Sequence, residues 1–307
     1  MSVDVTVAIC TWNRAGLLDQ TLAHLRGLAV PAGVTWELIV VDNNSTDHTP
    51  AVLARYADQF PLRAFHEPRQ GHSHARNKAV VEARGHLLLW TDDDVLVDTN
   101  WMAEYLKAAA AFPDAPFLGG PVRPWFERTP PAWVTRHLKR LSFSWAIVDF
   151  GPGVRLLGPG EYPVGANLGF RTDVLRQRPF DPDYGRVGNR LTSGDEARVI
   201  DQIRTGGAEG VWVGTAPVDH FLPAARMTTA YVFEINRWAG YYGYEPFAAD
   251  RSPRFAGAPR WVWKRHLAAA AKAFLLSPVK NDAWLTALLE QAKWRGLVDR
   301  FRAAAAA

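Results

Sequence analysis

The chain has 307 residues, of which 48% are hydrophobic and 21% are charged, and this balance excludes a disordered or fibrous protein. The net charge of +4 comes from scattered cations without a basic stripe, which argues against nucleic-acid binding. No stretch reaches the roughly 18 uninterrupted apolar residues of a membrane span, and the chain opens on a strand pattern rather than a secretory signal.

Strand and helix patterns alternate over the first part of the chain. We expect strands at residues 5–11, 36–41, 62–66 and 86–91, with helices at 15–27, 49–58 and 73–84. These repeated βα units predict the α/β class, with a mostly parallel sheet flanked by helices. Cys10 is the only cysteine and lies in the first strand, so an intrachain disulfide is impossible and a reducing, cytoplasmic compartment fits.

Polar clusters follow three of these strands at their carboxyl ends. They are residues 11–14, residues 42–47 and the triplet Asp92, Asp93 and Asp94. Ligands of open α/β sheets bind at this edge, so we expect the clusters to converge on one crevice. Three adjacent carboxylates repel one another, and a divalent cation that carries a phosphorylated ligand would compensate for this repulsion. The alternative is a solvated acidic turn before a helix that begins near Asn100.

The chain changes character after residue 120. Residues 121–162 are rich in proline, glycine and aromatic residues, which predicts an ordered but irregular region. We expect a strand at 164–170, a short helix at 171–178 and a loop at 181–192, after which Ser193 caps a helix that ends at 205. A short strand at 209–213 and helices at 228–242, 260–276 and 282–302 complete the chain, with a frayed tail at 303–307.

Short motifs stand in a fixed order between residues 3 and 245. They are Val7–Arg14, Val40–Asp47, Gly71–Ala79, Thr91–Asp94, Gly165–Arg171 and Ser193–Glu196. Together they resemble the motifs of family 2 glycosyltransferases of the GT-A fold. The resemblance implies an inverting enzyme that moves a sugar from a UDP-, GDP- or dTDP-linked donor to a hydroxyl of a saccharide or lipid-linked acceptor, in polysaccharide or glycolipid assembly. It also implies a GT-A domain at 1–245, with a nucleotide-sugar half at 1–122 and an acceptor half at 123–245, and a helical extension at 246–307.

The resemblance implies a donor site built from the three polar clusters. Asp94 is the expected direct ligand of Mg²⁺ or Mn²⁺, Asp92 would bind the ribose or the metal as well, and Asp93 lies between them. Asp42 would accept a hydrogen bond from the nucleobase, unless it only caps the next helix. Arg76 would approach the ribose or phosphates, unless it is a surface arginine. The residues expected to bind the nucleotide sugar are Thr11, Trp12, Asn13, Arg14, Asp42, Asn44, Gly71, Arg76, Asn77, Asp92 and Asp93.

The acceptor hydroxyl needs a carboxylate that removes its proton, because its pKa lies far above neutral. Asp195 and Glu196 are the implied pair, although their order reverses the family's Glu-Asp. Counting back from the glycine pair that follows the helix favours Glu196, whereas side-chain type favours Asp195. An acidic first helical turn is the alternative. His220 is a further candidate ligand of the metal or diphosphate, although a lone histidine is more often structural.

The resemblance implies that the acceptor would contact Asn167, and we expect the indole ring of Trp133 to contact it by stacking on a sugar face.

The basic and aromatic residues of the C-terminal helices predict either peripheral contact with the cytoplasmic face of a membrane or a packed bundle over the core. A non-catalytic nucleotide- or carbohydrate-binding protein of the same fold remains an alternative function. A nucleotidyltransferase would need a glycine-rich, lysine-containing loop after the first strand, and residues 11–16 contain no lysine.

Overall fold

The computed structural model describes residues 3–186, 188, 194–243 and 252–306, and the chain divides into two compact units. The first unit comprises Met1–Trp125, Ala146–Arg190 and Gly194–Phe221, and the second comprises Phe126–Trp145, Leu191–Ser193 and Leu222–Ala307. Helix α8 (Thr229–Tyr242), expected in the first domain, belongs to the second of these units. The functional division at residue 245 stays a prediction.

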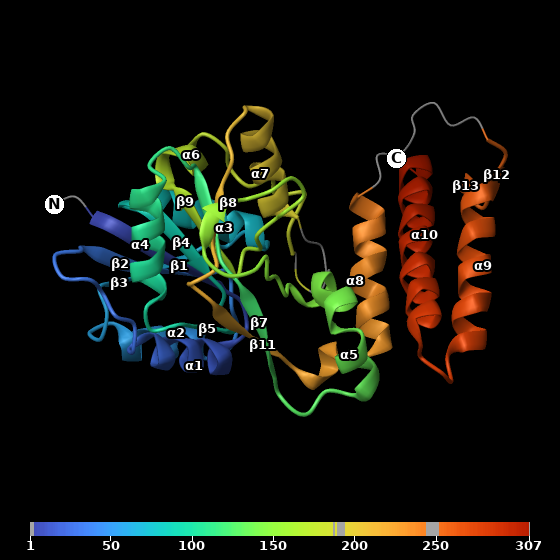
Figure 1. Cartoon of the computed structure of the whole chain (residues 1–307), viewed down its shortest axis with the longest axis horizontal. Helices are drawn as coiled ribbons and strands as arrows, with labels where there is room; N and C mark the ends of the chain where they lie inside the picture. The colour runs from blue at the N-terminus through green and yellow to red at the C-terminus, as the bar shows by residue number, and fades with distance from the viewer. Residues whose placement is uncertain (1–2, 187, 189–193, 244–251, 307) are drawn as a thin grey trace. The chain divides into compact units, whose positions relative to one another are not determined.

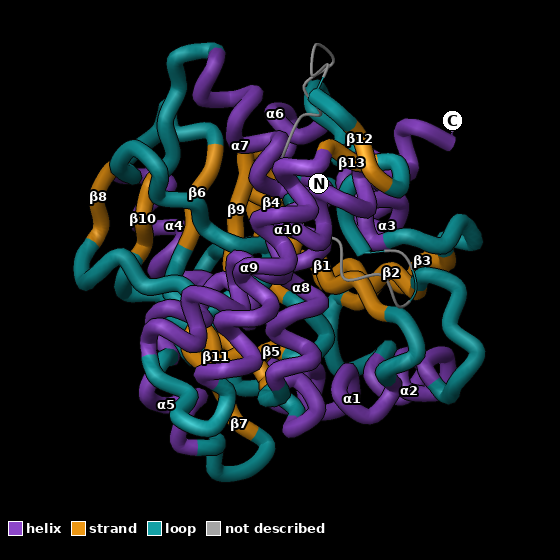
Figure 2. The backbone as a smooth tube through the Cα atoms, turned by 90° about the vertical axis from the view of Figure 1, so that its right-hand side faces the viewer, coloured by secondary structure: helices purple, strands orange, loops and turns teal. Residues whose placement is uncertain are grey.

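An eight-stranded sheet forms the centre of the first unit. Its order is β3 (Leu62–His66), β2 (Trp36–Asp42), β1 (Val3–Thr11), β4 (Gly85–Thr91), β9 (Asn167–Arg171), β6 (Phe117–Gly119), β10 (Val211–Val213) and β8 (Val154–Leu156). Figure 2 shows these strands from β8 on the left to β3 on the right. Strands β3, β2, β1 and β4 are parallel, whereas β9 runs antiparallel to both of its neighbours. The predicted α/β class with a mostly parallel sheet is confirmed.

Helices flank this sheet (Figure 1). They are α1 (Ala15–Leu25), α2 (Thr49–Tyr56), α3 (His72–Glu82), α4 (Trp101–Ala111), α6 (Thr172–Arg176) and α7 (Asp195–Thr205). A second, three-stranded sheet joins β5 (Val95–Val97), β11 (Val218–Leu222) and β7 (Val122–Phe126). Strand β5 follows the acidic triplet directly, so the small sheet brings β11 beside it.

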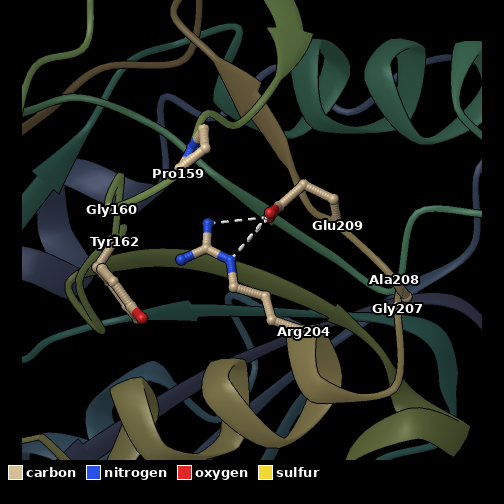
Figure 3. A pocket seen from close by; sticks show the side chains of 7 residues that line it. All are labelled: Pro159, Gly160, Tyr162, Arg204, Gly207, Ala208 and Glu209. Atoms are coloured by element: carbon tan, nitrogen blue, oxygen red, sulfur yellow. Dashed lines mark hydrogen bonds and ion pairs between the residues drawn. The ribbon is translucent and has the colours of Figure 1, made fainter.

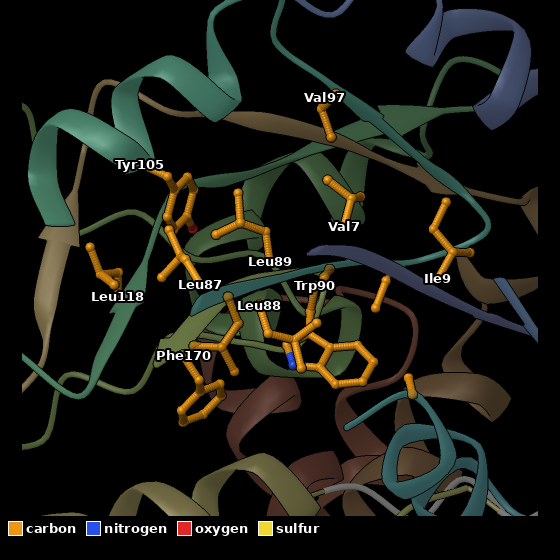
Figure 4. Packing of buried hydrophobic residues seen from close by; sticks show 14 of the residues in the cluster. Val7, Ile9, Leu87, Leu88, Leu89, Trp90, Val97, Tyr105, Leu118 and Phe170 are labelled. Carbon is orange, nitrogen blue, oxygen red and sulfur yellow. The ribbon is translucent and has the colours of Figure 1, made fainter. Parts of the chain in front are cut away.

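Alternation along β4 builds the core on both faces of the sheet. Leu87 and Leu89 point to the side of Tyr105 on α4, whereas Leu88 and Trp90 point to the opposite side (Figure 4). All of these side chains are at most 2% exposed, and successive strand residues face opposite sides of a sheet. A strand buried on both faces reads as a continuous apolar run, which is why the sequence predicts a strand at 86–91.

The second unit is helical. It contains α5 (Ala132–Arg136), the 3₁₀ segments η1 (Leu138–Trp145) and η2 (Ala224–Arg226), α8, α9 (Arg260–Leu276), α10 (Asp282–Ala306) and the short strands β12 (Arg254–Phe255) and β13 (Ala258–Pro259). Helix α10 packs against both α8 and α9, as Figure 1 shows. Gly240 and Gly296 allow α8 and α10 to approach closely, because a Cβ at either position would overlap a backbone oxygen of the other helix. Among the described residues, no helix combines the length and apolarity needed to cross a bilayer.

Several boundaries differ from those expected. The strand expected at 164–170 begins only at Asn167, and α10 continues through most of the tail that we expected to fray. The region 121–162 contains β7, β8 and α5 in addition to irregular backbone. Ser193, the expected cap of the catalytic-region helix, lies outside the described residues, and α7 begins at Asp195 after Gly194.

Trp133 has a structural role, which corrects its assignment to the acceptor site. Its indole is only 9% exposed and packs edge-on against Trp284 of α10, with a centroid separation of 5.6 Å. The ammonium of Lys280 lies 5.7 Å from the centroid of the Trp133 ring. Apolar and cationic neighbours within the same unit therefore cover the face on which a sugar would stack.

Candidate active site at the carboxyl edge of the large sheet

The register of the sheet brings the first two polar clusters together. Thr11 at the end of β1 pairs with Asp42 at the end of β2. Asn13 adopts the left-handed conformation with φ 51°, its N–H donates to Ser45 Oγ at 2.9 Å, and its Oδ1 accepts from the N–H of Thr46 at 2.7 Å. These bonds tie the loop after β1 to the loop after β2.

Asp42 lies at this junction and is 7% exposed. Its Oδ1 accepts the N–H of Ser45 at 2.9 Å, which closes a turn. The residue that precedes α2 is His48, so Asp42 does not cap that helix. Within the described residues, the second carboxylate oxygen of Asp42 has no hydrogen-bond partner and remains available to a ligand. Asn44 is exposed beside it, with φ 66°.

The acidic triplet follows β4, and Arg14 neutralises part of its charge. One guanidinium nitrogen, Nη1, lies 2.9 Å from Asp93 Oδ1 and 3.0 Å from Asp94 Oδ2. The hydroxyl of Thr11 donates to Asp93 Oδ2 at 2.7 Å. Both side chains were expected to line the nucleobase. The structure instead turns them toward the carboxylates, so they position the triplet, while Trp12 remains partly exposed.

Burial leaves the triplet electrostatically strained. Burial raises the pKa of Asp93 to about 6. Arg14 and the hydrogen bond from Thr11 act to lower this pKa, whereas the charge of Asp94 raises it further. Burial and the neighbouring Asp94 likewise raise the pKa of Asp92, whereas the charges of Arg76, His220 and Arg186 lower it. The carboxylates therefore still repel one another although Arg14 is bound to two of them.

His220 comes from β11 and lies beside Asp94. Its Nε2 is 3.5 Å from Asp94 Oδ1, and the imidazole is 5% exposed. The described residues contain no cluster of three or more histidine, cysteine or acidic side chains arranged to hold a metal ion. Carboxylate oxygens and an imidazole nitrogen are donor types that Mg²⁺ and Mn²⁺ accept, but Asp92, Asp94 and His220 do not form a complete metal site by themselves, so a metal here would also need a ligand's phosphates and water. The metal site stays a prediction.

A second acidic cluster forms at the start of α7 around Arg76 of α3. Nη1 of Arg76 lies 3.0 Å from Asp195 Oδ2 and 3.3 Å from Glu196 Oε2. The guanidinium carbon lies 5.7 Å from the ring centroid of Trp90 and 5.3 Å from that of Phe180, two rings that pack edge-on against each other, and the Arg76 side chain is 4% exposed. Arg76 is therefore a buried counter-ion of the acidic pair, which differs from both expectations, the phosphate contact and the surface arginine.

The two acids differ in environment. Burial raises the pKa of Asp195 well above its ordinary value, and Glu196 adds to this effect while Arg76 opposes it. Burial would also raise the pKa of Glu196, but the hydrogen bond from Asp195 and the charge of Arg76 hold it below the ordinary value. The side chain of Glu196 is 16% exposed and that of Asp195 only 3%. The two shifts thus favour ionisation of Glu196 over ionisation of Asp195.

Gly165 makes room for the Arg76 guanidinium. A Cβ at this position would overlap Arg76 Nη2, and the N–H of Gly165 donates to Glu196 Oε1 at 3.2 Å. We expect Gly165→Ala to displace Arg76, lower the free energy of unfolding by about 1–3 kcal/mol through overpacking, and reduce kcat. Urea denaturation and steady-state kinetics would measure both effects.

Gly16 offers the matched control for this substitution. A Cβ there would have no neighbour within 4 Å, so Gly16→Ala should leave stability and kcat close to those of the parent. Equal effects of the two substitutions would contradict the steric role assigned to Gly165.

Arg186 also lies near the acidic clusters, because its charge acts on both Asp92 and His72. We did not identify this residue from the sequence. Its carbonyl accepts the N–H of His72 at 2.8 Å. The loop passes close to the start of α7, since a Cβ added to Gly185 would lie 3.3 Å from Asp195 Oδ2. Burial and then the charges of Arg76 and Arg186 lower the pKa of His72. Nothing in the sequence distinguishes a loop arginine that belongs to the site from one on the solvent-exposed surface.

Asn167, another residue of the expected site, has an internal structural role. The amide of Asn167 is fully buried, donates to the carbonyls of Pro121 and Ala216, and accepts from Trp101 Nε1 and the Tyr105 hydroxyl. Its assignment to the acceptor is corrected, because no part of its side chain is accessible.

Asn77 and Gly71 likewise hold the backbone of the site. Asn77 exchanges two hydrogen bonds with the backbone of Phe180, at 2.7 and 2.8 Å, rather than facing the crevice. Gly71, expected to bind nucleotide, is buried at φ 145° and donates its N–H to Asn43 Oδ1 at 2.8 Å. Asn43 itself was not identified from the sequence.

A surface cavity of about 380 Å³ lies elsewhere in the first unit. Figure 3 shows Arg204 at the end of α7 paired with Glu209 beside it, with Nε to Oε1 and Oε2 distances of 3.0 Å. Its lining residues are Pro159, Gly160, Tyr162, Arg204, Gly207, Ala208 and Glu209, none of which belongs to the expected site. The cavity is therefore separate from the predicted site at the carboxyl edge of the large sheet.

Comparison with known sequences agrees with this arrangement. Residues 6–178, more than half of the chain, match the model of glycosyl transferase family 2. Validoxylamine A glucosyltransferase of Streptomyces hygroscopicus is 33% identical over 108 residues, which cover 34% of this chain and 25% of that protein. The succinoglycan biosynthesis protein ExoO of Rhizobium meliloti is 30% identical over 108 residues, 35% of this chain and 30% of that protein. The chain thus spans about a quarter to a third of the length of these relatives.

Solved structures extend the similarity to nearly the whole chain. The mannosyltransferase PcManGT of Pyrobaculum calidifontis, in complex with GDP-Man and Mn²⁺, has a TM-score of 0.62 at 21% identity over 98% of this chain and 87% of that one. S. aureus TarS in complex with UDP has a TM-score of 0.55 at 14% identity, over 95% and 90%. These similarities confirm the predicted GT-A fold. With the family match, they establish that the chain belongs to glycosyl transferase family 2.

Proposed function

We propose that this chain is a metal-dependent, inverting glycosyltransferase that moves a sugar from a nucleoside diphosphate sugar to an acceptor hydroxyl. The observation that supports this most is that Arg76 acts electrostatically on both acidic clusters. It is paired with Asp195 and Glu196, and its charge also lowers the pKa of Asp92. A donor-side carboxylate and an acceptor-side carboxylate therefore both lie within the influence of Arg76, which supports a shared site.

The donor half of the site recognises the nucleotide. Asp42 accepts a hydrogen bond from the base through its unpaired oxygen, and the partly exposed Trp12 lies beside it in the loop after β1. Arg186 supplies positive charge for the diphosphate near Asp92. Asp94, Asp92 and His220 would hold Mg²⁺ or Mn²⁺, which stabilises the negative charge that develops on the departing diphosphate.

Glu196 is the proton acceptor of the reaction. As the acceptor oxygen bonds to the anomeric carbon, Glu196 takes the hydroxyl proton and the bond from that carbon to the diphosphate oxygen breaks on the opposite face, which inverts the configuration. The Asp195 carboxyl donates a hydrogen bond to Glu196, and this bond and the charge of Arg76 favour the ionised form of Glu196. A Glu196 carboxylate that is already ionised when the acceptor binds can accept the hydroxyl proton without first losing one of its own.

The relatives support a proposal for the donor and acceptor classes. Structural neighbours hold GDP-Man, UDP-GlcNAc or UDP, and ExoO is a succinoglycan biosynthesis protein. We propose a hexose or N-acetylhexosamine donor linked to UDP, GDP or dTDP, and a saccharide or lipid-linked acceptor in polysaccharide or glycolipid assembly.

A thermal-shift panel tests the donor site. UDP, GDP, dTDP and their sugars are added with and without Mn²⁺, and unfolding is followed by fluorescence. The matching nucleotide at 100 times its Kd should stabilise the protein by about 2.7 kcal/mol, and only with metal. No metal-dependent stabilisation by any nucleotide would contradict the proposed donor site. Stabilisation without hydrolysis or transfer on an acceptor panel would favour the non-catalytic binding protein.

A further inference from the structure

Helix α9 has an unusual charge composition. Its sequence from Arg260 to Leu276 contains four lysine or arginine residues and no acidic residue. The next acidic residue along the chain is Asp282 at the start of α10. A surface helix of a globular protein normally mixes both signs on its solvent face, because opposite charges three or four residues apart stabilise it. The cationic bias of α9 is therefore not explained by the stability of the helix.

The buried side of α9 faces the rest of the second unit, to which the helix belongs. Val262, His266, Ala269 and Ala273 are buried and follow the helical repeat. Trp261 packs edge-on against Trp294 of α10 at 5.9 Å, and Trp263 against Phe255 at 6.2 Å. The tryptophans that suggested a membrane surface in the sequence are therefore partly covered by the bundle.

The opposite side exposes large apolar side chains. Leu267 is 60% exposed, Phe274 77% and Leu275 74%, and they fall at positions i, i+7 and i+8 of one face. Val279, in the turn after the helix, is 59% exposed. Arg260, Lys264 and Lys272 are exposed on the same side or its flank. We call this set of seven residues the α9 face.

We propose that the α9 face docks on an anionic lipid bilayer. Its apolar side chains lie between the middle of the helix and the following turn, where they can enter the boundary between head groups and acyl chains. Its cations carry no acidic neighbour on α9, so they are complementary to anionic head groups. A second copy of the same face would bring like charges together, which disfavours a dimer through this surface.

The helix is suited to lying in the membrane surface rather than crossing it. At about 1.5 Å per residue, its 17 residues span about 25 Å. Its buried side is occupied by α10, so only the outer face can enter lipid. This inference goes beyond the proposed function, because it depends on no step of sugar transfer.

Vesicle co-sedimentation of the full chain tests the proposal. The protein is mixed with vesicles of phosphatidylcholine alone, or of phosphatidylcholine with phosphatidylglycerol, at low and high NaCl. We expect binding to the anionic vesicles to be at least about tenfold tighter than to the neutral ones and to weaken as salt screens the charges. The double variant Phe274→Ser/Leu275→Ser should bind at least about tenfold more weakly to the anionic vesicles, since the apolar contact is lost.

Two controls make the result specific. Val81→Ser on α3 removes an apolar side chain that is 73% exposed elsewhere, and it should leave vesicle binding unchanged. The double variant should retain the parent's melting temperature and nucleotide-induced shift, because its substituted side chains are exposed. Equal binding to neutral and anionic vesicles, or equal binding by the parent and the double variant, would overturn the proposal. So would concentration-dependent self-association of the parent that the double variant abolishes without any vesicle binding.

Discussion

Replacing Glu196 by glutamine is expected to lower kcat by about 10²–10⁴-fold, the usual contribution of a positioned general base. Glutamine keeps the size of the side chain and can still accept from the N–H of Gly165, but it cannot take the acceptor's proton. Initial rates of nucleoside diphosphate release with saturating donor and acceptor would measure the loss. Donor affinity should change by no more than about twofold, because the proposal assigns Glu196 to the acceptor side.

Asp195→Asn is the matched comparison. The Asp195 carboxyl donates a hydrogen bond to Glu196, and the asparagine amide can replace that donor and remain beside Arg76. We expect a loss in kcat of about tenfold or less, well below that of Glu196→Gln. The opposite order of the two effects would reassign the base to Asp195. Unchanged turnover in both variants would exclude this pair from the chemistry.

Asp94→Asn is expected to abolish metal-dependent nucleotide binding and to lower kcat by about 10²–10³-fold, as removal of one electrostatic stabiliser of a developing anion typically does. The substitution weakens the oxygen ligand that faces His220 Nε2. Arg14 keeps its bond to Asp93, so the fold should persist. Thermal shift with the preferred nucleotide, titrated with Mn²⁺, would measure the loss of binding.

Asp114→Asn is the control for Asp94→Asn, because it removes a carboxylate that is exposed and remote in sequence from every site motif. It should respond to nucleotide and metal as the parent does. A Mn²⁺ response retained in the Asp94 variant would remove this residue from the metal site. A response retained after substitution of His220 by glutamine would show that the imidazole is not a ligand.

Local patterns predicted the architecture well. Period and turn signals located β1 to β4 within one or two residues, and α9 was expected with the bounds that the structure has. The convergence of residues 11–14, 42–47 and 92–94 followed from the rule for parallel strands and needed no knowledge of contacts. The short strands β5, β6 and β11 were not predicted, because three to five residues carry too little periodicity to separate a strand from a loop.

Partner choice was the part that the sequence did not determine. Arg76 pairs with Asp195 across 119 positions of sequence, and nothing in the motif around it distinguishes a carboxylate partner from a phosphate. Asn167 was assigned to the acceptor because of its motif, yet four internal hydrogen bonds and complete burial make it a brace between β9 and α4. Trp133 was assigned by residue type alone, and its environment depends on the packing of α10, which lies some 150 residues later.

The position of Arg14 bears on how the protein matures in the cell. Sites that consist only of repelling acids often need their metal before the surrounding chain becomes ordered. Here a cation encoded in the chain already contacts two of the three carboxylates. We therefore expect folding not to depend on the proposed metal, so that a newly made chain reaches its native state without it. Withdrawal of the proposed ion would then be expected to stop the proposed activity reversibly while the protein stays folded.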